Sequence, residues 1–418
     1  MDEVRGWVCE KRVVGGIVFL EVVTGLDLTP VTVVAKKRES PDAWRAARKV
    51  RTGSAVLARG VFKKEAVSRK GRELGLEELV VLAEPLVEKP PVDYSGKTGV
   101  LLDTSIEYRY LTLRLPRWRA IYRIRAEVVE AARRFFRSRG FLEVHTPKIC
   151  GAGAEGGATL FTIDYFGRKA FLAQSPQLYK QMLMAGVPRV FEITPYFRAE
   201  KFSTVRHLNE SWGVDAEIGF IDGVDDVLRV LEEFIVYVYG HVKKSCRGEL
   251  EALRVRLEVP RAPFRRLDYG EALEILRGEG YGLKWGDDLG ADEEAVLGRV
   301  LREEGCSFYF IVGYPWEAKP FYIMRDGDAS RAFDLDCEGM ELASGGQREH
   351  RYGELVKNIE EKGLSPEGFG FYLEAFRHGM PPHGGFGLGL DRLLMKMLGL
   401  SNIREVVLFP RDRQRLVP

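Results

Sequence analysis

The 418-residue chain has few cysteines, almost no net charge and no long apolar run. Its five cysteines form no Cys-x-x-Cys pair and no cluster with histidine, which argues against a zinc site or a disulfide framework and fits a reducing compartment. They are Cys9, Cys150, Cys246, Cys306 and Cys337. With no apolar run of membrane-spanning length and no charged-then-apolar leader, we expect a soluble, cytoplasmic chain with no membrane contact. The net charge of +2 excludes a general polycation.

The first 88 residues contain five apolar runs of strand length and one helical segment at 42–49. The runs are 6–9, 17–23, 31–35, 55–62 and 79–83. This pattern predicts an OB-type β-barrel, an architecture that binds single-stranded nucleic acid. From Lys36 to Arg72, thirteen Lys or Arg residues stand against three acidic ones, which suits either a nucleic-acid backbone or an ordinary solvated barrel face. A linker or hinge is expected at 89–116, beginning with Lys89-Pro90-Pro91, and a second domain at 117–418.

The segment 191–210 places two arginines and two glutamates around a short loop between two strand-like runs. Arginine is always charged and contacts phosphate oxygens bidentately, so Arg198 and Arg206 can hold an extended triphosphate. Glu200 and Glu210 can accept hydrogen bonds from an adenine amino group or an ammonium. An isolated Arg-x-Glu is more often part of a surface hairpin with ion pairs, so this segment needs support from the rest of the chain.

Two further segments provide that support. Residues 385–394 form a glycine-rich strand that enters an apolar helix, where the helix N-terminus and Arg392 favour a phosphate. An amphipathic helix closed by Gly140 precedes the run Gly140 to Pro147.

In residue types, order and distance, these three segments resemble the signature motifs of class II aminoacyl-tRNA synthetases, and most closely those of the archaeal and eukaryotic type of aspartyl-tRNA synthetase. The resemblance spans about Arg119 to Pro418. Its most specific parts lie outside the three motifs, at 174–181, 333–334, Glu341, 344–350 and 408–413. It implies an α+β fold, in which an antiparallel-sheet catalytic domain with flanking helices follows the N-terminal OB-fold barrel.

The resemblance also implies an ATP site. Arg198 corresponds to the α-phosphate ligand and Arg392 to the γ-phosphate ligand, and with Glu200 they are the candidate catalytic residues. The remaining candidate ATP-binding residues are Arg206, His207, Glu210, Glu341, Gly387 and Gly389. Asp334 and Glu341 correspond to the carboxylates that bind Mg²⁺ between the phosphates. Trp212 is either the adenine-stacking partner or a core residue.

For the amino acid, the resemblance implies L-aspartate. Lys180 and Arg348 match the two cations that hold the substrate β-carboxylate. Asparagine has nearly the same shape, so we expect charge to discriminate, because two buried cations without their anion would cost about 3–5 kcal/mol. The other matching positions are Glu155 on a glycine-rich loop, Ser175, Gln177 and Asp215, the last a candidate for the α-ammonium.

The predicted barrel departs from the family pattern while keeping Phe19 to stack a base. Val23 and Thr24 replace an Arg-Asp pair, Pro30 falls near an expected glutamine, and Cys9 stands where archaeal relatives have His or Trp. We therefore expect weak anticodon reading, with tRNA(Asn) charged as well as tRNA(Asp). Two alternatives stay open: an asparagine-synthetase-like paralogue that passes aspartyl-adenylate to ammonia, and a non-catalytic RNA-binding relative. The family's first motif, here around Gly140 to Pro147, implies a homodimer.

Overall fold

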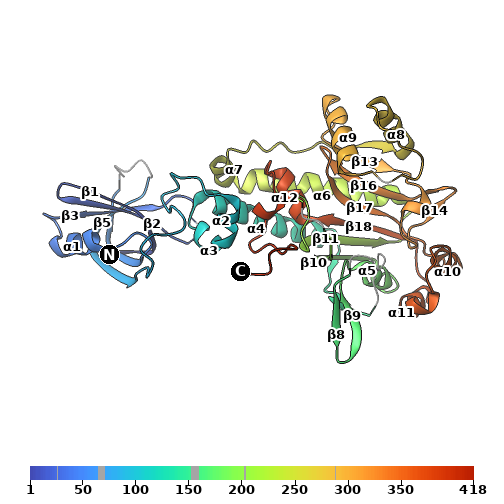
Figure 1. The fold of residues 1–418 in the computed structure, drawn as a ribbon, viewed down its shortest axis with the longest axis horizontal. Coiled ribbons are helices and arrows are strands. Elements are labelled where there is room, and N and C mark those ends of the chain that lie inside the picture. The colour runs from blue at the N-terminus through green and yellow to red at the C-terminus, as the bar shows by residue number, and fades with distance from the viewer. Residues whose placement is uncertain (26, 65–70, 152–159, 202–203, 288) are drawn as a thin grey trace. The chain divides into compact units, whose positions relative to one another are not determined.

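The structure is a computed structural model that describes residues 1–418 except 26, 65–70, 152–159, 202–203 and 288. The chain forms two compact units (Figure 1). One comprises Met1–Arg125, Cys246–Arg256 and Pro418, and the other comprises Ala126–Ser245 and Leu257–Val417. The first division, between Arg125 and Ala126, falls within helix α4 (Pro116–Ser138). Among the described residues, no helix combines the length and the hydropathy that crossing a membrane requires.

The first unit contains a closed barrel with strand order β1-β2-β3-β5-β4 in the part of the chain that the structure describes. Its elements are β1 (Asp2–Val14), β2 (Ile17–Val23), β3 (Val31–Lys36), α1 (Pro41–Lys49), β4 (Ala55–Phe62) and β5 (Glu73–Ala83). This confirms the predicted barrel with its helical insert, although β1 and β5 are longer than the apolar runs indicated. The unit also contains α2 (Leu102–Glu107), α3 (Arg109–Thr112) and α7 (Arg247–Leu253). Helices α2 and α3 therefore lie within the predicted linker.

Alternate side chains of β2 point into the barrel core. Val18, Leu20 and Val22 are fully buried in the barrel core. Because successive side chains of a strand point to opposite faces, Phe19 and Glu21 lie on the other face, where Phe19 is partly exposed and Glu21 is buried and accepts from the Thr32 hydroxyl at 3.1 Å. The Arg12 guanidinium lies 5.4 Å from the centre of the Phe19 ring.

The second unit is built on an eight-stranded sheet, counted over the described residues, with order β12-β13-β16-β17-β18-β11-β10-β6. The strands are β6 (Leu142–Glu143), β10 (Arg189–Phe197), β11 (Glu210–Gly219), β12 (Arg265–Asp268), β13 (Phe308–Val312), β16 (Ala332–Cys337), β17 (Glu341–Gln347) and β18 (His383–Gly389). Among the described strands of this sheet, β6 and β12 pair in parallel with their neighbours, and the other pairs are antiparallel. The predicted class II type of sheet is thereby confirmed.

Shorter sheets and helices surround this sheet. The sheets are β7 (Ile149–Cys150), β9 (Arg168–Leu172) and β8 (Thr162–Tyr165), and β14 (Arg325–Asp326) with β15 (Ala329–Ser330). The helices are α4 (Pro116–Ser138), α5 (Gln177–Leu183), α6 (Val224–Ser245), α8 (Tyr269–Gly278), α9 (Ala291–Glu303), α10 (Tyr352–Glu361), α11 (Gly370–Phe376) and α12 (Leu390–Met397). Short 3-10 helices occur at Trp316–Ala318, Pro366–Phe369 and Ile403–Glu405.

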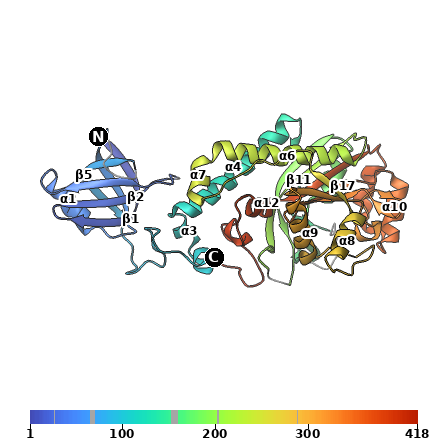
Figure 2. The same cartoon turned by 90° about the horizontal axis from the view of Figure 1, so that it is seen from above.

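Helices α4 and α6 run side by side against the sheet (Figure 2). Phe136 of α4 stacks on Phe191 of β10 at 4.9 Å between ring centres and lies 5.0 Å from Phe234 of α6. Such aromatic pairs form the core between helices and strands. Along β11, alternation then directs Asp215 and Glu217 to the face opposite the buried Val214.

Candidate active site

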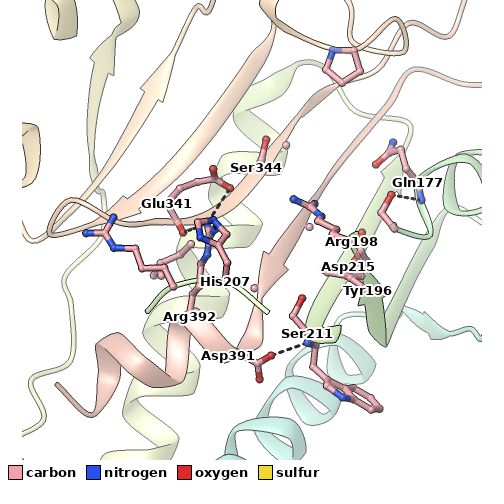
Figure 3. Close-up of a pocket in the computed structure, with 18 of the residues that line it drawn as sticks. Gln177, Tyr196, Arg198, His207, Ser211, Asp215, Glu341, Ser344, Asp391 and Arg392 are labelled. Carbon is pink, nitrogen blue, oxygen red and sulfur yellow. Dashed lines mark hydrogen bonds and ion pairs between the residues drawn. The ribbon is translucent and has the colours of Figure 1, made fainter. Parts of the chain in front are cut away.

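A pocket opens over β10, β11, β17 and β18 and is bordered by the start of α12 (Figure 3). Most of the residues predicted for nucleotide and amino acid line it. They are Ser175, Gln177, Arg198, Glu200, Arg206, His207, Asp215, Glu341, Arg348, Gly387, Gly389 and Arg392. Segments more than 200 residues apart in the sequence thus form one polar cavity. Glycine at 387 matters locally, because an added Cβ would lie 3.3 Å from Asp215 Oδ1.

Arg392 is held in place by two partners near the pocket (Figure 3). Its Nη1 donates to the Glu341 backbone oxygen at 3.0 Å, and its Nη2 donates to His207 Nε2 at 3.3 Å. His207 Nδ1 lies 2.6 Å from Thr204 Oγ1. Burial, with the Arg392, Arg198 and Arg206 charges, lowers the pKa of His207 to about 4. A neutral ring fits this geometry, because only an unprotonated Nε2 can accept from arginine.

Asp334 and Glu341 lie on the adjacent antiparallel strands β16 and β17. Asp334 is buried, and its Oδ2 accepts from Lys319 Nζ at 2.8 Å. Among the described residues, its Oδ1 has no hydrogen-bond partner. A buried carboxylate oxygen without a donor is suited to a cation. The described residues contain no group of three or more His, Cys, Asp or Glu arranged to hold a metal, so this pair would need further ligands from elsewhere.

A third carboxylate, which the sequence reasoning did not assign, lies near this pair. Glu294 of α9 accepts from Arg206 Nη1 at 3.5 Å, and the same nitrogen donates to the Gly339 oxygen at 3.4 Å. Burial and the nearby Glu341 carboxylate raise the pKa of Glu294 to about 7. Burial also raises the pKa of Glu200. The cationic and acidic groups of the pocket are therefore strongly coupled.

The two predicted β-carboxylate ligands belong to a buried ionic cluster. Lys180 Nζ lies 2.8 Å from Asp215 Oδ1 and 3.4 Å from Glu217 Oε2, and Arg348 contacts Glu217 through two nitrogens at 2.9 and 3.2 Å. The Tyr196 hydroxyl donates to Asp215. Burial disfavours the charge on Glu217, but Arg348 and Lys180 outweigh it and hold its pKa below the usual value.

This cluster corrects the charge argument drawn from the sequence. Lys180 and Arg348 already have two protein carboxylates as partners, so a neutral substrate would not leave them as bare buried cations. The cost of about 3–5 kcal/mol applies to removing one protein partner of the cluster. Glu217 was missed, although it follows Asp215 at the two-residue spacing of a strand face, which is the signal that could have found it.

The remaining predicted residues lie in different places. Lys180 and Asp334 are buried beside the pocket and do not line it. Glu210 of β11 also lies outside the lining, and its backbone forms an isolated antiparallel β-bridge with Arg411. Glu155 lies outside the described residues. Trp212 lines the pocket with 37% of its surface exposed, so it is not a core residue. Phe19 belongs to the barrel.

The sheet and its arginine-lined pocket define a class II tRNA synthetase. The chain belongs to the family described as tRNA synthetases class II (D, K and N), whose model matches residues 102–413.

Relatives of the aspartate type match the whole chain. The aspartate–tRNA(Asp) ligase of Pyrococcus horikoshii is 47% identical over 421 residues, covering 100% of this chain and 96% of the relative. The aspartate–tRNA(Asp/Asn) ligase of Methanopyrus kandleri has the same identity and coverage.

Solved structures of both amino-acid types resemble the fold. Asparaginyl-tRNA synthetase from Pyrococcus horikoshii complexed with asparaginyl-adenylate gives a TM-score of 0.92 at 35% identity, covering 100% of this chain and 96% of that one. Aspartyl-tRNA synthetase from Entamoeba histolytica gives 0.86 at 31% identity, covering 100% and 89%. The fold alone therefore does not distinguish aspartate from asparagine.

Proposed function

We propose that this chain is an aspartate–tRNA ligase that activates L-aspartate with ATP and transfers it to tRNA(Asp), with tRNA(Asn) as a second acceptor. The observation that carries the activation of a substrate by ATP is the polar pocket lined by Arg198, Arg206 and Arg392. The full-length aspartate-type relatives support the amino acid. One of these relatives is named for tRNA(Asp) alone and the other for tRNA(Asp) and tRNA(Asn), and both are 47% identical to this chain. The use of tRNA(Asn) therefore goes beyond what the two names share.

In the first half-reaction, an α-carboxylate oxygen of aspartate attacks the α-phosphorus of ATP and pyrophosphate leaves. Arg198 would neutralise charge that builds on the α-phosphate, and Arg392 and Arg206 would hold the terminal phosphates. His207, as a neutral acceptor, would orient Arg392. In the second half-reaction, a hydroxyl of the tRNA 3′ end attacks the activated carbonyl carbon and AMP leaves.

Mg²⁺ fits the acidic pair formed by Asp334 and Glu341. Asp334 and Glu341 would bind it, and the Oδ1 of Asp334, which has no hydrogen-bond partner among the described residues, supports this assignment. When bound, the ion supplies neutralisation of polyphosphate charge. Glu200 and Glu210 are proposed to contact the adenine, which Trp212 can cover.

We also propose a division of labour along the chain. Residues 1–88 would contact the anticodon through Phe19 and the basic segment, 89–116 would act as a hinge, and 117–418 would catalyse both half-reactions. Glu155 is proposed to cover the bound amino acid.

The active form is proposed to be a homodimer whose interface includes Gly140 to Pro147. The support is the likeness to the family's first motif and the partly exposed apolar Leu142 on β6. Sedimentation at micromolar concentration should give a dimer. A fully active monomer would exclude this interface.

A charging assay tests the main proposal. Purified chain, ATP, Mg²⁺ and radiolabelled aspartate should label tRNA(Asp), and omission of ammonia should make no difference. Formation of free asparagine only when ammonia is added would favour the asparagine-synthetase-like alternative, and the absence of both products would favour a non-catalytic RNA-binding relative.

A further inference from the structure

A line of hydrogen bonds connects the pocket to a buried histidine. Gln177, which lines the pocket, donates from Nε2 to Gln181 Oε1 at 2.8 Å. Gln181 Nε2 lies 3.1 Å from His383 Nε2, and His383 Nδ1 lies 2.8 Å from the Pro381 carbonyl oxygen. Gln181 and His383 are fully buried, and the two glutamines are four residues apart on α5, where they share a helix face.

The chemistry of the partners fixes every proton in this line. A carbonyl oxygen only accepts, so His383 Nδ1 must carry a hydrogen. In the neutral ring Nε2 is then an acceptor, so Gln181 must direct its amide nitrogen to the histidine and its oxygen to Gln177. Gln177 in turn must direct its nitrogen to Gln181. The amide oxygen of Gln177 is then the atom of this amide that does not contact Gln181.

The opposite orientation of Gln177 has a specific cost. If both amides turned over, Gln181 would present its oxygen to His383 Nε2, and the ring would need hydrogens on both nitrogens. That ring is the imidazolium. Complete burial, only partly opposed by the nearby Glu217 charge, lowers the pKa of His383 to about 4. A neutral ring at ordinary pH therefore holds the whole line in one orientation.

We propose that Gln181 and His383 are positioning residues that fix Gln177 as a hydrogen-bond acceptor for the α-ammonium group of the amino-acid substrate. The inference rests on the proposed function only in that the substrate is an α-amino acid. Without the line, the Gln177 amide can turn and present two N–H donors, which repel an ammonium.

The test compares two substitutions at one buried position. Gln181→Met removes both hydrogen bonds at similar length, whereas Gln181→Glu keeps an acceptor for Gln177 Nε2. In ATP–pyrophosphate exchange, Gln181→Met should raise the KM for aspartate about tenfold, the scale of one hydrogen bond to a charged group, and change the KM for ATP less than twofold. Gln181→Glu should raise the KM for aspartate no more than about threefold, about 0.7 kcal/mol.

Succinate lacks the α-ammonium, so its inhibition constant separates a specific effect on the ammonium contact from a general disturbance of the pocket. Its inhibition constant against aspartate should be the same in wild type and Gln181→Met. Equal weakening of aspartate, succinate and ATP would overturn the proposal, as would an unchanged KM for aspartate in Gln181→Met. Should Gln181→Met not fold, His383→Asn replaces it under the same criteria. Failure of the wild type to activate any α-amino acid would refute the proposed function, a separate outcome.

Discussion

The pocket region buries charged side chains, whereas the barrel face exposes them to solvent. Lys180, beside the pocket, and Arg348, which lines it, are each 2% exposed and are bound to buried carboxylates. On the barrel, the side chains of Arg12 and Arg72 are 58% and 55% exposed, and their ion pairs lie at 4.0 and 3.2 Å. Buried pairs lose several kcal/mol when one partner is removed, whereas exposed pairs contribute about 0–1 kcal/mol. The pocket should therefore be intolerant of substitution and the barrel tolerant.

The same contrast fits the departures from the family pattern. Val23 is buried, and the Thr24 hydroxyl donates to Asp27 at 3.0 Å. Both residues fit the closed barrel, and neither supplies the charged side chains of an Arg-Asp pair. A fold can survive such changes because its core residues, among them Val22 and Val33, point the other way.

The largest effect should come from Arg348→Leu. This change leaves the fully buried Glu217 without its bidentate partner and should cost about 3–5 kcal/mol. The kcat/KM for aspartate in pyrophosphate exchange should fall at least about a hundredfold, about 2.7 kcal/mol. The matched control is Arg377→Leu, which removes a 62% exposed arginine paired with the 55% exposed Glu374 and should change exchange less than about threefold. Equal effects of the two changes would remove the contrast between buried and exposed charge.

Glu341→Gln should have the next largest effect. Loss of one ionic contact to Mg²⁺ should reduce aspartate-dependent exchange at least about tenfold, about 1.4 kcal/mol. The Mg²⁺ concentration needed for half-maximal rate should rise. Exchange at the wild-type rate and wild-type Mg²⁺ dependence would reject the metal assignment.

Phe19→Ala should separate the two regions. Loss of one stacked base costs about 1–3 kcal/mol, so the KM for tRNA should rise about fivefold or more. Exchange without tRNA should not change, because Phe19 lies in the barrel unit. Val61→Ala, at a 55% exposed position on β4, serves as the control. If Phe19→Ala and Val61→Ala gave the same tRNA KM, Phe19 would not contact the anticodon.

The smallest effect concerns the choice of tRNA. Because stacking and phosphate contacts give affinity more than sequence choice, tRNA(Asp) and tRNA(Asn) should be charged with similar efficiency and strong salt dependence. Rejection of tRNA(Asn) by about a hundredfold, about 2.7 kcal/mol, would show that the barrel reads the third anticodon base through other contacts.

The sequence predicted the barrel and the class II sheet, because apolar runs of strand length indicate the barrel strands and the order and spacing of the motifs are typical of class II enzymes. It also predicted most of the charged or titratable residues that line the pocket, since these residues occur in recognisable motifs. It did not predict the partners of buried charges. The residues that Glu217, Glu294 and His383 contact lie far away in the chain, and the folded sheet brings His383 to Gln181. The sequence argument also treated Lys180 and Arg348 as unpaired cations, which the structure corrects.

The most direct test of the central claim is ATP–pyrophosphate exchange by the wild-type chain, with aspartate or asparagine as the only amino acid and no tRNA or ammonia present. The account predicts that aspartate supports exchange with a kcat/KM at least about a hundredfold above that for asparagine, about 2.7 kcal/mol. Exchange supported equally or better by asparagine would contradict the assignment of aspartate and would place the chain with the asparaginyl enzymes that share its fold.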